Sequence, residues 1–200
     1  MTPSRILIVL TAVLGLGFYL GPRLDRHVDQ DRLAGIATVI AGREVGVSCP
    51  GAVESMTEIS SNAGSVRFTA DGRPGNEAEL SSETCARLRA LLNGDIPGLD
   101  CLSTFLGCPE RVEEAAAAVN VLSHEAWHLA GVRDEAVAQC YAVQTNAETA
   151  IRLGADREDA EAIAEFALLR IQPALPPEYR SNACHDGSPL DLNPLRPGWP

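Results

Sequence analysis

Two histidines and a glutamate form the pattern H-E-x-x-H at residues 124–128 of this chain. One helical turn takes about 3.6 residues, so residues four apart lie on one face of a helix. On a helix, the imidazoles of His124 and His128 can therefore meet at one metal ion. Glu125 is rotated by about 100° from His124 and can reach a water on that metal without binding the metal itself. Two imidazoles, one carboxylate and an open fourth position are typical of catalytic zinc.

Two carboxylates that follow the motif are candidates for the third protein ligand. Asp134 lies six residues after His128, and Glu135 lies one residue further on. At the start of a helix, both carboxylates also have an ordinary structural role as N-cap and first-turn charge. The spacing alone leaves the choice between them open.

The chain around the motif has helical patterning. It predicts a helix from about residue 110 to 130 that ends at Gly131, and a second from about 134 to 154. Asp156 is a candidate N-cap for a third helix, and Ser81 for an earlier one that ends near residue 94. The motif and its candidate third ligand would then lie on two consecutive helices that pack together.

Apolar and polar residues alternate in two stretches, 45–49 and 65–70, which indicates short strands. We expect a small antiparallel sheet beside the helices, and hence a mostly helical α+β fold. The stretch 65–70 has two interpretations: a structural hairpin, or a sheet edge along which an extended peptide substrate binds. Residues 178–200 are rich in Pro, Gly, Asn and Asp and predict an extended C-terminal tail.

The N-terminal stretch predicts export or membrane attachment. Residues 6–22 are uncharged and largely apolar, so we interpret residues 1–22 as a signal anchor or a signal peptide. Residues 23–42 are then expected to be a juxtamembrane linker, with a helix as one conformation open to it, and residues 43–200 the folded domain with an extended C-terminal tail. The predicted location is membrane-anchored with an extracytoplasmic domain, or secreted.

The charge of the chain argues against nucleic acid as a partner. It has 16 Lys and Arg against 27 Asp and Glu, a net charge of -11, and no basic cluster.

All six cysteines follow the apolar segment, and an even number in an exported chain predicts disulfides in an oxidising compartment. A cysteine-ligated zinc site is disfavoured because the chain has no C-x-x-C pair. Cys49 ends a strand and Cys85 opens the next helix, and Cys101 and Cys108 share one loop. The expected pairs are Cys49–Cys85, Cys101–Cys108 and, by elimination, Cys140–Cys184.

Residues 135–142, E-A-V-A-Q-C-Y-A, resemble the E-x-x-A-D-x-F-A helix signature of gluzincin-type zinc metallopeptidases, including the small minigluzincins. The resemblance extends over about residues 120–145. It implies Zn²⁺ held by His124, His128 and Glu135, Glu125 as general base, and a peptide or protein substrate. Gln139 departs from the signature, which has Asp there to support a histidine ligand.

A competing pattern, H-E-x-x-H-x-x-G-x-x-D, resembles the metzincins and would make Asp134 the ligand. No Met-turn follows it, because the chain's two methionines are Met1 and Met56. The gluzincin resemblance is therefore the better one.

A peptidase also needs a donor for the oxyanion, and the candidates are His185, Tyr141 and Tyr179. A Cys140–Cys184 disulfide would bring His185 towards the metal, although a surface histidine is an equally good interpretation.

The sequence leaves two other functions open. One is a catalytically degenerate metallopeptidase fold that serves as an interaction module of the cell envelope, and the other is a disulfide-linked helical protein without a metal.

Overall fold

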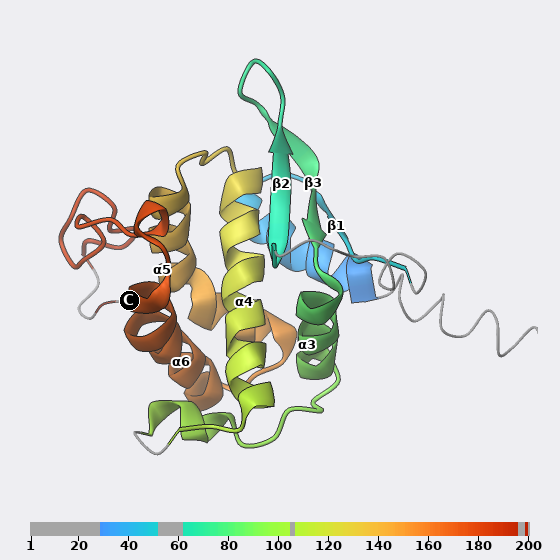
Figure 1. Ribbon diagram of the computed structural model, residues 1–200, viewed down its shortest axis with the longest axis vertical. Helices are drawn as coiled ribbons and strands as arrows, with labels where there is room; N and C mark the ends of the chain where they lie inside the picture. The colour runs from blue at the N-terminus through green and yellow to red at the C-terminus, as the bar shows by residue number, and fades with distance from the viewer. Residues whose placement is uncertain (1–28, 52–61, 105–106, 196–198, 200) are drawn as a thin grey trace, which may run out of the picture.

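The computed structural model describes residues 29–51, 62–104, 107–195 and 199. The described chain is mostly helical with one small three-stranded sheet, as expected for an α+β fold (Figure 1). The predicted signal segment, residues 1–22, lies outside the described residues. Within the described residues, no helix has the length and apolar character needed to cross a membrane.

Helix α4 (Glu110–Leu129) runs through the middle of the molecule (Figure 1). The sheet and α3 (Ser82–Leu92) lie on one side of it, and α5 (Glu135–Leu153) lies on the other. Small and branched side chains of α4 are fully buried among these elements: Val112, Ala115, Ala116, Val119, Leu122, Ala126 and Leu129. The alanines let neighbouring elements approach closely, so the helix that carries the H-E-x-x-H motif is packed on several sides.

The predicted helix starts are confirmed by their caps. The side chains of Ser81, Asp134 and Asp156 each accept a hydrogen bond from a backbone N–H in the first turn of α3, α5 and α6 (Arg157–Phe166) respectively. The chain then continues through a π-helical turn (Ala167–Ile171), a short helix α7 (Gln172–Ala174) and a 3₁₀ turn (Pro177–Tyr179).

The sheet has the strand order β1-β3-β2, with β1 at Gly46–Ser48, β2 at Gly64–Phe68 and β3 at Pro74–Leu80. Strands β2 and β3 are antiparallel, but β1 pairs with β3 in parallel. The expectation of a purely antiparallel sheet was therefore wrong, because β1 pairs with a strand that is not its neighbour in sequence. The other edge of β2 pairs with no described strand.

The segment expected to be a juxtamembrane linker, residues 23–42, contains a helix at residues 29–41. Leu33, Ile36 and Ala37 lie on one face of this helix and are buried in the same core as α4. The helix passes behind the sheet in Figure 1. The folded domain therefore includes this helix, and does not begin at residue 43 as the sequence suggested.

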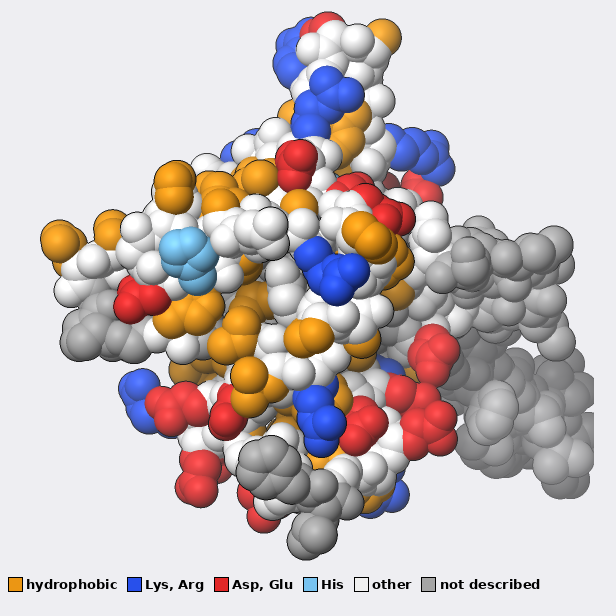
Figure 2. Space-filling view, turned by 60° about the vertical axis from the view of Figure 1, so that its left-hand side comes forward, with side chains coloured by type: hydrophobic (Ala, Val, Ile, Leu, Met, Phe, Trp, Pro, Cys, Tyr) orange, Lys and Arg blue, Asp and Glu red, His pale blue; other side chains and the backbone are white. Residues whose placement is uncertain are grey.

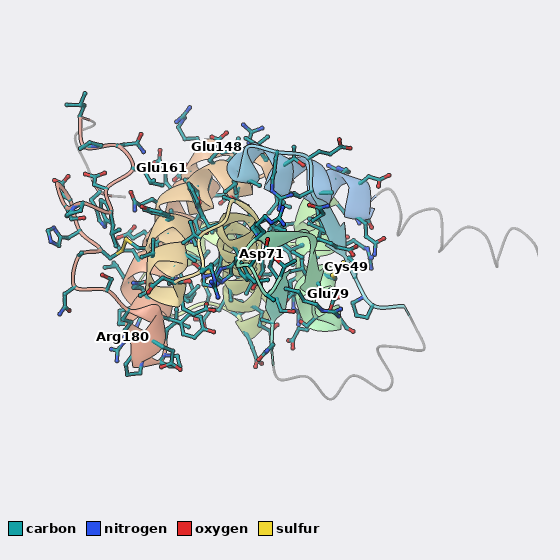
Figure 3. All side chains as sticks on the ribbon, turned by 90° about the horizontal axis from the view of Figure 1, so that it is seen from above. Cys49, Asp71, Glu79, Glu148, Glu161 and Arg180 are labelled. Atoms are coloured by element: carbon teal, nitrogen blue, oxygen red, sulfur yellow. A yellow bond between two sulfur atoms is a disulfide. The ribbon has the colours of Figure 1, made fainter. Side chains whose placement is uncertain are left out.

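All three predicted disulfides are present: Cys49–Cys85, Cys101–Cys108 and Cys140–Cys184. The third joins α5 to the C-terminal segment. That segment, around Arg180, lies at the opposite end of the molecule from Cys49 and the sheet (Figure 3). Three disulfides are compatible with an extracytoplasmic location.

Candidate metal centre

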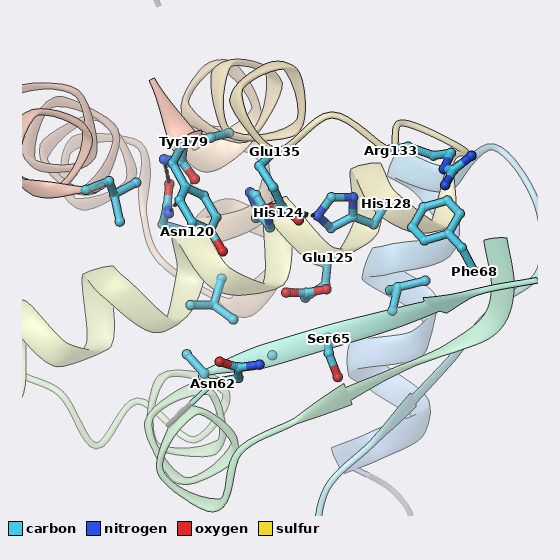
Figure 4. Close-up of a pocket in the computed structure, with 16 residues that line it drawn as sticks. Asn62, Ser65, Phe68, Asn120, His124, Glu125, His128, Arg133, Glu135 and Tyr179 are labelled. Atoms are coloured by element: carbon cyan, nitrogen blue, oxygen red, sulfur yellow. Dashed lines mark hydrogen bonds and ion pairs between the residues drawn. The ribbon is translucent and has the colours of Figure 1, made fainter. Parts of the chain in front are cut away.

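Three ligand-type atoms from α4 and the first residue of α5 converge at one point (Figure 4). Glu135 Oε2 lies 3.0 Å from His124 Nε2 and 3.2 Å from His128 Nε2, and the two Nε2 atoms are 2.9 Å apart. Ligands about 2.0–2.1 Å from a tetrahedral ion are roughly 3.4 Å from one another, close to these distances. The donor set and its spacing thus fit a metal ion.

The turn after α4 orients His128. Gly131 has φ +102°, a conformation that favours glycine, and its N–H donates to the carbonyl of His128 at 2.9 Å. The Val132 N–H donates to the carbonyl of Trp127 at 3.1 Å, which completes a Schellman motif. This turn directs the Val132 carbonyl back to His128, whose Nδ1–H donates to it at 2.7 Å. With its proton on Nδ1, His128 presents the Nε2 lone pair to a metal.

The same short connection separates the two candidate carboxylates. Asp134 is the N-cap of α5, and its Oδ1 accepts a hydrogen bond from the Val137 N–H at 3.0 Å. Glu135, the first helical residue, turns its carboxylate to the histidines instead. The structure therefore groups Glu135 with His124 and His128, and engages Asp134 in capping.

His124 is buried and lacks the supporting partner that the family resemblance implies. Among the described residues, no side chain or backbone group lies in good hydrogen-bond geometry to its Nδ1. The side-chain amide of Gln139 instead exchanges two hydrogen bonds with that of Asn120, at 3.3 and 3.2 Å. Burial, reinforced by the neighbouring His128, lowers the pKa of His124 below its usual range. The ring is thus neutral at pH 7, which is the form that binds metal.

Glu125 faces the same cavity from below the two histidines (Figure 4). Its Oε2 is buried and has no hydrogen-bond partner in the part of the chain that the structure describes. Burial, with a further contribution from the negative charge of Glu135, raises its pKa to about 8. Strand β2 passes very close to it: a Cβ on Gly64 would lie 2.8 Å from Glu125 Cγ and 2.9 Å from Oε1. The close approach requires glycine, a constraint that the sequence pattern did not reveal.

The metal ligands and Glu125 line a cavity of about 470 Å³. Strand β2 forms one wall of the cavity with Gly64, Ser65, Val66 and Phe68, and the C-terminal segment contributes Leu175 and Tyr179. The site is therefore an open pocket between α4, α5 and an edge strand.

Of the three candidate oxyanion donors, the structure brings only Tyr179 to this pocket. Its ring centroid lies 5.7 Å from that of His124. Tyr141 does not line the pocket and packs on Trp127, with ring centroids 4.8 Å apart. His185 is exposed, outside the pocket, and its Nδ1–H donates to the Asp186 carbonyl at 2.9 Å. The Cys140–Cys184 disulfide thus anchors the segment that carries Tyr179, but does not direct His185 to the site.

No family model, curated protein or solved structure matches the chain. The pocket combines three convergent metal-ligand atoms with a buried carboxyl group and a phenol, in a place where an extended chain can reach them.

Proposed function

We propose that this protein is a zinc-dependent peptidase of the gluzincin type, with Zn²⁺ held by His124, His128 and Glu135. The observation that carries the proposal is the convergence of these three ligand atoms on a pocket that also contains the Glu125 carboxyl group. Two imidazoles and one carboxylate leave one position open on zinc, as catalytic sites require. Glu125, one residue after the first ligand, provides the base that peptide hydrolysis needs.

When bound, zinc supplies a Lewis acid that polarises the scissile carbonyl and lowers the pKa of a water molecule. Glu125 removes a proton from the attacking water and delivers it to the leaving amine. The position of Glu125 favours this role, because its carboxyl group faces the pocket beside the three candidate ligands. The Tyr179 hydroxyl, at the pocket wall, donates to the oxygen that gains negative charge.

Strand β2 supports a peptide as substrate. It lines the pocket, and its outer edge pairs with no strand in the part of the chain that the structure describes. An extended peptide can add to such an edge through backbone hydrogen bonds, which bind many sequences. The proposed peptidase acts outside the cytoplasm, attached to the membrane or secreted, in keeping with its three disulfides and the apolar stretch at residues 6–22.

The test is the metal content of the purified protein and of three variants, by elemental analysis. The wild type should hold about one zinc per chain. His128→Ala and Glu135→Ala should lose it, whereas Asp134→Ala, the matched control one residue away, should keep it. If Asp134→Ala loses zinc and Glu135→Ala retains it, the proposed ligand set is wrong.

The chemical step is tested with Glu125→Gln. This variant should keep zinc and lose at least about a hundredfold in peptide hydrolysis, since general-base catalysis typically contributes that much. Tyr179→Phe should reduce kcat, whereas His185→Ala should not. Loss of zinc from Glu125→Gln would show that the glutamate is a ligand instead of a base.

A second candidate function is a metal-binding interaction module of the cell envelope that does not turn over substrate. It is favoured by one observation, the unpartnered Nδ1 of His124, because outer-shell partners normally raise the basicity of a histidine ligand. Failure of the zinc-loaded wild type to cleave a broad peptide library would support this alternative. A protein that binds no zinc would exclude both functions.

A further inference from the structure

An arginine stands at one end of the pocket. Arg133 lines the pocket, and its guanidinium carbon lies 5.5 Å from the centroid of the Phe68 ring (Figure 4). Its Nη1 would be 2.8 Å from a Cβ on Gly72, so the turn between β2 and β3 passes directly beside it. The aromatic face and the nearby backbone hold the guanidinium at a defined place at the mouth of the pocket.

The positive charge of Arg133 is not neutralised by any described carboxylate. The space-filling view shows several basic side chains on the projecting β2–β3 hairpin (Figure 2). Two of them are paired: Arg67 with Glu79 at 2.7 Å, and Arg73 with Asp71 at 2.5 Å. None of the ion pairs among the described residues involves Arg133. It is also the one Lys or Arg among the described residues that line the pocket.

We propose that Arg133 forms a subsite for an acidic side chain of the substrate, on the amino-terminal side of the scissile bond. This inference rests on the proposed peptidase function and specifies its substrate class. A guanidinium donates two parallel hydrogen bonds to a carboxylate, which gives both attraction and orientation. The chain as a whole has a net charge of -11 and repels acidic peptides at long range, so the preference depends on this local contact.

The side of the scissile bond follows from the direction of β2. The strand runs from Gly64, beside Glu125, to Phe68, whose ring lies 5.9 Å from that of His128 and next to Arg133. A peptide that adds antiparallel, the more stable pairing, has its amino-terminal part beside Phe68. Gly64 and Phe68 are four residues, or about 13 Å, apart along an extended strand. Because the Phe68 ring already lies beside the candidate ligand His128, Arg133 should contact one of the three residues that precede the scissile bond.

The first experiment uses pairs of peptides that are identical except at one position, which carries Glu in one peptide and Gln in the other. That position is varied over the three residues on each side of the cleaved bond. The zinc-loaded wild type should prefer Glu about tenfold in kcat/KM at one amino-terminal position, mainly through KM. This ratio should fall to about one in Arg133→Gln. Arg73→Gln, the matched control, removes an arginine of the neighbouring β2–β3 hairpin that is already paired with Asp71, and should retain the preference.

Three results overturn the subsite: no preference for Glu, a preference on the carboxyl-terminal side, or a preference that survives in Arg133→Gln. A second experiment separates this proposal from the peptidase activity. It uses peptides whose carboxyl terminus is replaced by a hydroxamate, a group that binds zinc. With the hydroxamate on the metal, the peptide residues lie on the amino-terminal side of the site, and no cleavage is needed. Tighter binding of the Glu than of the Gln hydroxamate, lost in Arg133→Gln, supports the subsite even if no peptide is hydrolysed. Equal affinities overturn it even if peptides are cleaved.

Discussion

The buried carboxyl group of Glu125 should make the stability of the metal-free protein depend on pH. Its pKa in the folded protein is raised from 4.5 to about 8, chiefly by burial and then by the charge of Glu135. The folded state therefore favours the protonated form. The contribution of protonated Glu125 to the free energy of unfolding is fully present below pH 4.5 and is lost as the pH rises through 8. At about 1.4 kcal/mol per pKa unit, the loss is at most about 5 kcal/mol.

Glu125→Gln removes this titration while keeping the shape of the side chain. We expect urea unfolding of zinc-stripped, disulfide-intact protein to show the difference at pH 5 and pH 8.5. Between these values the wild type should lose about 3–5 kcal/mol of unfolding free energy relative to the variant. Other titrating groups, including both histidines, are common to the two proteins and cancel in the comparison. Glu110→Gln, an exposed position on α4, is the matched control and should show no such change.

The reasoning is refuted if wild type and Glu125→Gln differ by the same free energy at both pH values. That result would mean that the Glu125 carboxylate is solvated when ionised, and not enclosed between α4 and β2. A change of the opposite sign, with the wild type gaining stability relative to the variant as the pH rises, would mean that a favourable partner holds the ionised form.

Two glycines at the site give further predictions. Gly64→Ala should displace Glu125 and lower kcat/KM by about ten- to hundredfold while the zinc content stays the same, measured by kinetics and elemental analysis. Gly131→Ala should cost about 1–2 kcal/mol in urea unfolding and weaken zinc binding, because it disturbs the turn that orients His128. Gly35→Ala, in the helix at residues 29–41, is the control: its Cβ meets nothing within 4 Å, so it should stabilise the protein slightly.

The features that the sequence predicted correctly are those that local chemistry determines. Asp134 and Asp156 cap helices because their carboxylates satisfy nearby backbone N–H groups, whatever lies elsewhere in the fold. The i, i+4 spacing of His124 and His128 likewise depends only on the helix that carries them. Disulfide pairing was predictable because each cysteine has a distinct position relative to the predicted elements.

The features that were missed depend on contacts between distant segments. The parallel pairing of β1 with β3 depends on the tertiary arrangement of the two strands. The alternation of polar and apolar residues within one strand does not show which strand it pairs with. A helix was open for residues 29–41, but its place in the core was not predicted, because that depends on the distant residues against which its apolar face packs. Tyr141 and His185 were expected near the candidate metal ligands, but neither lines the pocket. The packing of α5 and the turns of the C-terminal segment decide where these two side chains lie.

The three metal-ligand residues fall within twelve consecutive positions, 124–135, on a single helix–turn–helix unit. The walls around them come from far away in the chain, from β2 on one side and from Leu175 and Tyr179 on the other. The three candidate ligands are thus fixed by one local unit, whereas the rest of the pocket depends on how distant segments pack against that unit. Substitutions in β2 or around Tyr179 can therefore reshape the pocket while the spacing of the three ligand-type atoms stays unchanged.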